Sequence, residues 1–302
     1  MSAVEVAAGA VSGATFEWRG GRALAIAHAV EPLPERAVQP ALNGVNLLER
    51  EVVVGAIGRV LERIGKPRRI GLILEDPVAR ISLVKLQQVP ARAADLDQII
   101  RFQVRKAAPF PIEDAQVSYV PALRSEEGQE FVVTLARRDV VVEYESACGD
   151  AGAHAGIVDL STLNVVNAAI ASGAAPAGDW LLVNVSADWA SMAVLRGSSI
   201  MFFRTRGADG EGTLEDLVHQ TAMYYEDRLE GAGLARALVC AAPGGAVDAL
   251  VRGLAGRVSV PLEIVDPAGA VVLAEPVAAT RDLMHTLTPL AGMVLRDREA
   301  AA

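Results

Sequence analysis

Residues 181–203 read LLVNVSADWASMAVLRGSSIMFF, and this stretch decides how the rest of the chain is interpreted. The residues from Leu182 to Val185 are typical of a β-strand, a short loop of small residues follows, and a second strand runs to the turn at Arg196. The pattern predicts a β-hairpin followed by a tight turn and a third strand. Loops of this kind present backbone N–H groups that can hold an anion such as phosphate. The question is whether this loop does so.

The same pattern occurs in residues 4–26, which read VEVAAGAVSGATFEWRGGRALAI. A constant offset of 177 residues, without a gap, places Val6 opposite Val183 and Gly9 opposite Ser186. It also places Trp18-Arg19-Gly20 opposite Leu195-Arg196-Gly197. Each copy then reads as strand, loop, strand, Arg-Gly turn and third strand, which favours an internal duplication. The alternative is a chance likeness between two hairpins.

The segments that follow each hairpin support the duplication. After the first copy, residues 49–64 carry apolar side chains at helical spacing, and a strand is expected at residues 69–74. After the second copy, Thr213-Leu-Glu-Asp216 is a capping box that opens a helix. A strand at 237–241 and a helix at 247–254 are expected next. Two such halves predict an α/β protein of two lobes with a cleft between them.

A further segment interrupts the first half. Strands are expected at 80–86, 116–120 and 130–136, with a helix at 94–107 between the first two. We therefore predict a small αβ module, the inserted module, at residues 79–136. The first lobe is expected to comprise 1–78 and 137–175, and the second lobe 176–302.

Composition excludes several classes of function. The 302 residues are 52% hydrophobic and carry a formal net charge of −9, so no basic surface indicates nucleic acid or an anionic membrane as a partner. No segment is apolar enough for direct membrane insertion, and the N-terminus lacks the basic region of a signal peptide, so a cytoplasmic location is expected. The four histidines and two cysteines show no metal-ligand spacing, and no nucleophile-elbow or Walker motif occurs. No metal site and no catalytic residue is predicted.

At this point the chain resembles the actin-like ATPase superfamily, in which two duplicated lobes each begin with a phosphate-binding hairpin. Residues 95–119, DLDQIIRFQVRKAAPFPIEDAQVSY, narrow the resemblance to the type IV pilus assembly protein PilM family. The segments ARRDVVVEYESACGDAG, GEGTLEDLVHQTAMYYEDRL and VPLEIVDP fit the same family. The resemblance implies an FtsA-like fold, in which the inserted module replaces the usual actin subdomain. Cytoplasmic domains of GspL proteins and MSHA-type pilus proteins are related.

The resemblance also implies a job: docking the N-terminal cytoplasmic tail of a PilN-like inner-membrane protein, and so a position peripheral to the inner membrane. A non-catalytic scaffold of this kind is the leading hypothesis. The alternatives are an active ATPase or kinase of the superfamily, and an FtsA-like filament-forming protein. A pilus motor ATPase and further copies of the chain are additional candidate partners.

Active members of the superfamily carry an acid at the start of each hairpin loop. Comparison with the PilM-like pattern puts Ala7 in place of the first acid, Ala14 in place of a lysine and Asn184 in place of the second acid. We therefore expect a degenerate nucleotide cleft and no cofactor, with weak binding of ATP or ADP left open through backbone groups. The residues expected to bind a nucleotide in this degenerate cleft are Gly9, Ala10, Ser12, Ser186, Ala187, Asp188, Gly244 and Gly245.

The helix at 94–107 suggests where the partner binds. Its apolar stripe is expected to face the module's own sheet, which leaves Phe102 on the polar face beside Arg101 and Arg105. Phe102 is either a partner anchor or a contact with the first lobe. The rigid Phe110-Pro111-Ile112 that follows is expected to form a wall of a groove between module and lobe.

Overall fold

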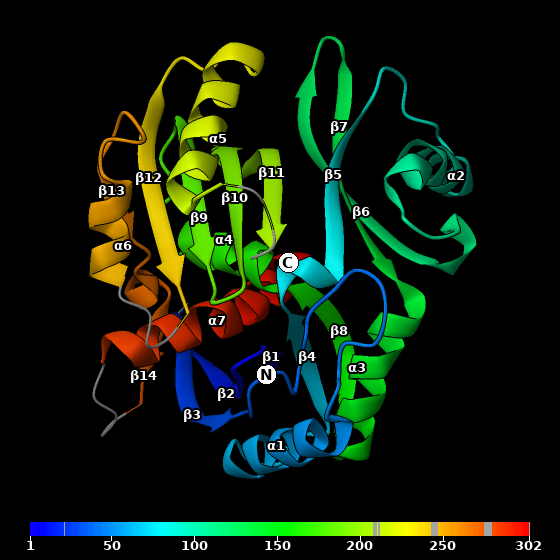
Figure 1. The fold of residues 1–302 in the computed structure, drawn as a ribbon, viewed down its shortest axis with the longest axis vertical. Helices are drawn as coiled ribbons and strands as arrows, with labels where there is room; N and C mark the ends of the chain where they lie inside the picture. Colours follow the sequence, from blue (N-terminus) through cyan, green and yellow to red (C-terminus); the bar gives the residue numbers. More distant parts are fainter. Residues whose placement is uncertain (21, 208–209, 211, 243–246, 275–279, 302) are drawn as a thin grey trace.

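The computed structural model describes the whole chain except residues 21, 208, 209, 211, 243–246, 275–279 and 302, and the side chains of 297–301. Its strands form three sheets, one for each lobe and one for the inserted module. Figure 1 shows the two lobes stacked, with the inserted module beside the second lobe. No helix in the described part of the chain is both long enough and apolar enough to cross a bilayer.

The first lobe is built on a six-stranded sheet in the order β14-β3-β2-β1-β4-β8. Helices α1 and α3 cover one face of this sheet, and α7 covers the other. On α1, Val53, Ile57 and Val60 are buried, as their helical spacing predicts. The elements are β1 (Ser2–Val6), β2 (Ala10–Arg19), β3 (Arg22–Pro32), α1 (Arg50–Arg63), β4 (Arg69–Leu74), α3 (Arg138–Asp150), β8 (His154–Leu160) and α4 (Ser161–Ala171).

The second lobe is built on a five-stranded sheet in the order β11-β10-β9-β12-β13. Helices α5 and α6 pack on one face, and α4 packs against the other. The expected capping box is present, because Thr213 Oγ1 accepts from the Asp216 N–H and Asp216 accepts from the Thr213 N–H. The elements are β9 (Asp179–Val185), β10 (Trp189–Arg196), β11 (Ser199–Gly207), α5 (Leu214–Arg228), β12 (Leu234–Ala241), α6 (Val247–Leu254) and β13 (Leu262–Ile264).

The inserted module is a three-stranded antiparallel sheet in the order β5-β7-β6, with one helix on one face. Its elements are β5 (Ala79–Leu86), α2 (Ala93–Val104), β6 (Ala115–Ser125) and β7 (Gly128–Arg137). The sequence predicts these four elements in this order. The α-helix ends at Val104, and residues 105–107 continue as a single 3₁₀ turn.

The C-terminal segment departs from the expected domain boundaries. Residues 176–302 are assigned to the second lobe by the sequence, yet β14 (Val271–Leu273) pairs with β3 of the first sheet. Helix α7 (Arg281–Ala301) buries Leu287, Leu290 and Met293 against the same sheet. The chain therefore returns to the first lobe after β13. The sequence alone does not assign β14 or α7 to a lobe, because a strand of three residues and a helix with one apolar face could pack in either lobe.

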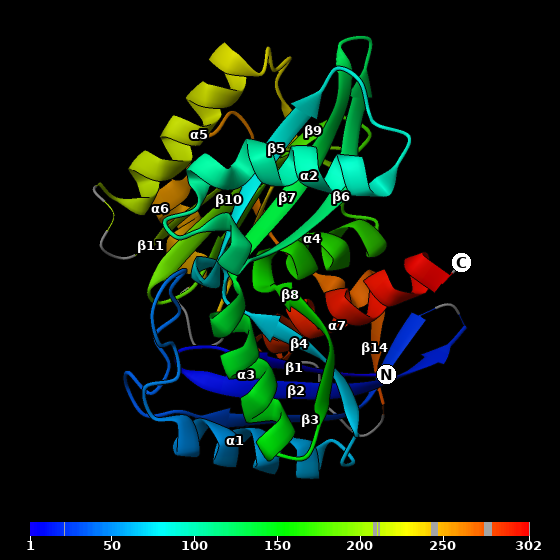
Figure 2. The ribbon, with the colours of Figure 1, turned by 90° about the vertical axis from the view of Figure 1, so that its right-hand side faces the viewer.

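Helices α4 and α7 lie in contact between the two lobes (Figure 2). A Cβ placed on Gly292 of α7 would stand 1.8 Å from the backbone oxygen of Asn164 in α4, so no side chain fits there. This close approach brings α7 into the space between the sheets, where His285 and Pro289 reach the cleft described below.

Candidate functional site

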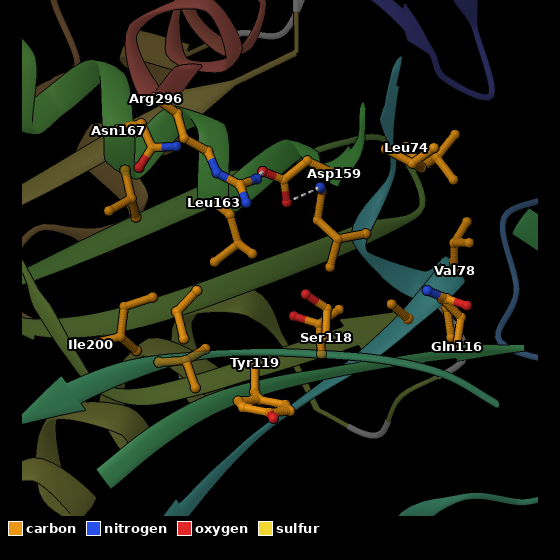
Figure 3. Close-up of a pocket in the computed structure, with 18 of the residues that line it drawn as sticks. Leu74, Val78, Gln116, Ser118, Tyr119, Asp159, Leu163, Asn167, Ile200 and Arg296 are labelled. Carbon is orange, nitrogen blue, oxygen red and sulfur yellow. Dashed lines mark hydrogen bonds and ion pairs between the residues drawn. The ribbon is translucent and has the colours of Figure 1, made fainter. Parts of the chain in front are cut away.

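A cavity of about 720 Å³ lies where the inserted module meets the first lobe, and we call it the module groove. It is bordered by β6 and β7 of the module, by α3, β8 and α4, by the turn between β10 and β11, and by Arg296 of α7. Figure 3 shows Ser118 and Gln116 of β6 on one side and Asp159, Leu163 and Asn167 on the other. The groove thus joins three parts of the chain that are distant in sequence.

Strand alternation explains why the module presents this face. On β6, Val117 turns towards α2 and the module core, while Gln116, Ser118 and Val120 border the groove. Tyr119 packs against the module core and also lines the groove. β7 follows the same rule, with Phe131, Val133 and Leu135 in the module core and Val132, Thr134 and Ala136 along the groove. One face of the sheet therefore holds α2, and the other is left for the groove.

An ion pair stands on the first-lobe side of the groove. The guanidinium of Arg296 donates to the carboxylate of Asp159, which is 9% exposed, while the Arg296 side chain is 44% exposed. Burial raises the pKa of Asp159, and the nearby charge of Arg296 offsets part of this effect. Arg138 and Glu145 of α3 also line the groove. The groove therefore combines an apolar interior with charges of both signs.

The residues predicted to bind a partner do not line this groove. Phe102, Arg101 and Arg105 lie on α2 and the turn that continues it, which cover the opposite face of the module sheet (Figure 1). Phe102 is 60% exposed and the Arg105 guanidinium lies 4.1 Å from its ring centre, so the alternative that Phe102 packs against the first lobe is wrong. Arg101 pairs with Asp97 on its own helix at 2.8 Å.

The turn after α2 is likewise directed into the module. Phe110 and Ile112 pack against the module core, and Pro111 is exposed. None of the three is among the described residues that line the groove. The groove between module and lobe exists, but its walls come from β6, β7, α3 and α4. Sequence alternation along 116–122 is the signal that could have indicated these residues.

A second cavity, of about 360 Å³, lies between the two hairpin loops, and we call it the interlobe cleft. Of the residues predicted to bind a nucleotide, Gly9, Ala10 and Ser12 line this cleft from the first lobe, and Ser186 and Ala187 line it from the second. Asp188 is exposed and is not among the described residues that line the cleft. The predicted residues Gly244 and Gly245 fall outside the described residues.

Strand register corrects one step of the sequence interpretation. Glu5 pairs with Ser12 in the first hairpin, and Asn184 pairs with Ser191 in the second, so Glu5 and Asn184 are equivalent. The offset is therefore 179 residues at the loops (184 − 5), although it remains 177 at the Arg19 and Arg196 turns (196 − 19). The difference arises because β2 has 10 residues and β10 has 8. The inference that the first hairpin lacks an acid is wrong, since Glu5 holds that place.

Two further acids, Glu75 and Asp76, follow β4 directly and were missed by the sequence analysis. Glu75 is 2% exposed, and its carboxylate accepts from the Ala8 N–H at 2.7 Å, from Ser186 Oγ at 3.0 Å and from Trp189 Nε1 at 2.7 Å. The sequence signal was available, because Glu-Asp-Pro directly follows a strand of buried apolar residues.

Asp76, the next residue, also accepts hydrogen bonds from two different parts of the chain. It is 1% exposed and accepts from the Thr162 N–H at 3.0 Å, from the Thr162 hydroxyl and from Ser191 Oγ at 2.5 Å. Asn184 donates to the same Thr162 hydroxyl at 2.8 Å. Glu75 and Asp76 thus connect the first lobe to the hairpin of the second.

The acids in and beside the cleft have raised pKa values. Burial raises the pKa of Glu5 to about 7 and that of Asp76 to about 6, and it also raises the pKa of Glu75. Mutual repulsion adds to the effect of burial, and hydrogen bonds from neutral donors offset part of both. Among the described residues that line the cleft there is no Lys or Arg.

Two of the donors that a phosphate would use in this cleft are already engaged, because Ala8 N–H and Ser186 Oγ donate to Glu75. No group of three His, Cys, Asp or Glu side chains that could hold a metal ion occurs among the described residues. His285 Nδ1–H donates to the Ala241 carbonyl at 3.1 Å, and the buried Nε2 of His285 has no hydrogen-bond partner among the described residues.

Comparison with proteins of known structure identifies the fold. The structure of a PilM-PilN type IV pilus biogenesis complex matches with a TM-score of 0.81 at 16% identity, covering 100% of this chain and 98% of that chain. A Bacteroides thetaiotaomicron protein of actin-like ATPase fold and unknown function matches at 0.52 and 10% identity, with 95% of each chain covered.

A third match is the cytoplasmic domain of EpsL, an inner-membrane component of the type II secretion system of Vibrio cholerae. Its TM-score is 0.52 at 11% identity, over 95% of this chain and 93% of that chain. The expected duplicated, actin-like α/β fold is therefore confirmed. The family model for the type IV pilus assembly protein PilM matches residues 5–238. The chain belongs to the PilM family of type IV pilus assembly proteins.

Proposed function

We propose that this protein is a docking component of a pilus or related secretion machine, and that it binds the N-terminal cytoplasmic tail of a PilN-like inner-membrane protein in the module groove. The observation that supports this most directly is the groove itself, a cavity of about 720 Å³ lined by apolar, polar and charged side chains at the junction of the first lobe and the module. The similarity of the fold to the structure of a PilM-PilN complex suggests a PilN-like protein as the partner. Binding would hold the protein peripheral to the inner membrane.

The groove suits an extended peptide. β6 is an edge strand of the module sheet, because its one sheet neighbour is β7. An edge strand offers unpaired backbone N–H and C=O groups, and an extended peptide can pair with them while its alternate side chains enter pockets. Val120, Leu163 and Ile200 supply apolar surface for such side chains. A disordered tail would lose conformational entropy on binding, so a preformed groove favours the complex.

The test uses a labelled synthetic peptide from the cytoplasmic N-terminus of a PilN-like inner-membrane protein. Val120 borders the groove and is 50% exposed, so Val120→Asp should leave the fold intact and place a charge on apolar surface. We expect fluorescence anisotropy to show affinity weakened by at least about tenfold, roughly 1.4 kcal/mol.

The matched control is Phe102→Ala, which removes a similarly exposed apolar side chain from the opposite face of the module. We expect this variant to bind the peptide as the wild type does. Weaker binding in Phe102→Ala with unchanged binding in Val120→Asp would show that the peptide binds α2 instead of the groove.

We also propose that the protein does not hydrolyse ATP. The second hairpin carries Asn184 where an acid is expected, and the described lining of the cleft offers no cation to a phosphate. Phosphoryl transfer depends on positioned charge, so these losses should reduce its rate by orders of magnitude. Magnesium-dependent release of phosphate by purified protein, abolished by Glu5→Gln, would contradict this proposal.

A further inference from the structure

Glu75 stands between the two hairpin loops, each of which begins one of the lobes. Its Oε2 atom accepts from the Ala8 N–H in the loop between β1 and β2. Its Oε1 atom accepts from Ser186 Oγ in the loop between β9 and β10, and from the indole of Trp189 at the start of β10. One carboxylate oxygen therefore contacts each lobe.

The donors that meet this carboxylate are those that a protein uses to hold a phosphate group. A loop N–H, a hydroxyl and a ring N–H converge on the carboxylate from two sides. Among the described residues, no Lys or Arg forms an ion pair with Glu75. Burying an ionisable group in this way costs free energy unless hydrogen bonds compensate for the lost water. Three donors at 2.7–3.0 Å provide that compensation.

The surroundings of Glu75 disfavour a second anion. Asp76 lies near enough to raise the pKa of Glu75, and Glu75 lies near enough to raise the pKa of Glu5 on β1. An incoming phosphate would therefore meet three carboxyl groups. It would also have to displace Glu75 from the Ala8 and Ser186 donors. A phosphate therefore cannot gain these hydrogen bonds without breaking those already formed.

We propose that the Glu75 carboxylate occupies the anion site formed by the two hairpin loops and clasps the two lobes together in place of a nucleotide. Asp76 extends the clasp, because it connects Thr162 at the start of α4 with Ser191 of β10. The lobes are thus held closed by the chain itself. This inference is independent of what binds in the module groove.

The test compares the wild type with Glu75→Ala and Glu75→Gln. Calorimetric titration with pyrophosphate should show at least about tenfold tighter binding in the variants. Both substitutions remove a negative charge, Glu75→Ala frees all the donors that meet the carboxylate, and Glu75→Gln frees those that meet one of its two oxygens. Glu75→Gln keeps the shape of the side chain and carries the test if the alanine variant does not fold. The control is Glu113→Gln, which removes an exposed acid of the module and should bind pyrophosphate as the wild type does.

A second measurement reports on the lobes directly. Spin labels on cysteines introduced at the exposed residues Glu62 of α1 and Glu226 of α5 give an interlobe distance distribution, since both native cysteines are buried. We expect a wider distribution in both Glu75 variants than in the wild type. Equal pyrophosphate affinity in the wild type and both variants, or an unchanged distance distribution in both, would overturn the proposal.

Discussion

Replacing Glu5 by glutamine should make the protein less sensitive to pH. Glu5 borders the interlobe cleft, where burial raises its pKa from 4.5 to about 7. The carboxyl group therefore binds its proton more tightly in the folded protein than in the unfolded chain. Stability must then fall as the pH rises from about 4.5 to about 7, because the unfolded state ionises first. The glutamine side chain of the Glu5→Gln variant cannot ionise, and its oxygen can still accept from Ser161 Oγ, as the Glu5 carboxyl does.

The size of the effect follows from the shift. A difference of 2.5 pH units, from 4.5 to 7, corresponds to about 3 kcal/mol, at 1.36 kcal/mol per unit. Most of this, about 2.5 kcal/mol, develops between pH 5 and pH 8. With an unfolding entropy of about 2.1 cal/mol/K per residue, the 302-residue chain has roughly 0.6 kcal/mol/K, so the expected change in melting temperature is about 4 °C.

Differential scanning calorimetry at pH 5 and pH 8 provides the measurement. Glu5→Gln should melt about 5 °C above the wild type at pH 8, with a difference of about 1 °C at pH 5. Glu62→Gln serves as a control, because Glu62 is exposed and Lys66 lowers its pKa. It should change the melting temperature by less than about 1 °C at either pH. If the wild type and Glu5→Gln show the same change between the two pH values, Glu5 is not held protonated in the cleft.

Two further pairs of variants test a helix contact and a helix cap of the fold. Gly292→Ala places a Cβ within 1.8 Å of the Asn164 carbonyl oxygen, so α4 and α7 must separate, and we expect at least about 2 kcal/mol of destabilisation in thermal unfolding. Gly149→Ala, at an open position on α3, should leave stability unchanged or raise it, and a similar result for both would contradict the close helix contact. Thr213→Ala removes the cap of α5 and should cost about 1 kcal/mol. Thr213→Ser should retain most of that stability, and equal losses in the two variants would indicate that the hydroxyl does not cap the helix.

The sequence by itself determined most secondary structure and its duplication. Apolar spacing along α1, the capping box at Thr213 and the strand–loop–strand pattern of both hairpins are local features. They arise from a period of 3.6 or 2 residues and from hydrogen bonds within a turn, which need no distant partner. For the same reason, the elements of the inserted module are found in the predicted order.

Only the tertiary structure decided which faces meet and which acids are buried. The amphipathic pattern of α2 shows that one stripe is covered, but not that the helix lies on the side of the sheet away from the groove. Likewise, the apolar face of α7 does not reveal which lobe it covers. Glu75 and its donors Ser186 and Trp189 are more than 100 positions apart in the chain, so their hydrogen bonds form only when the lobes close. Local patterns specify helices and strands, whereas contacts between distant elements depend on how the whole chain packs.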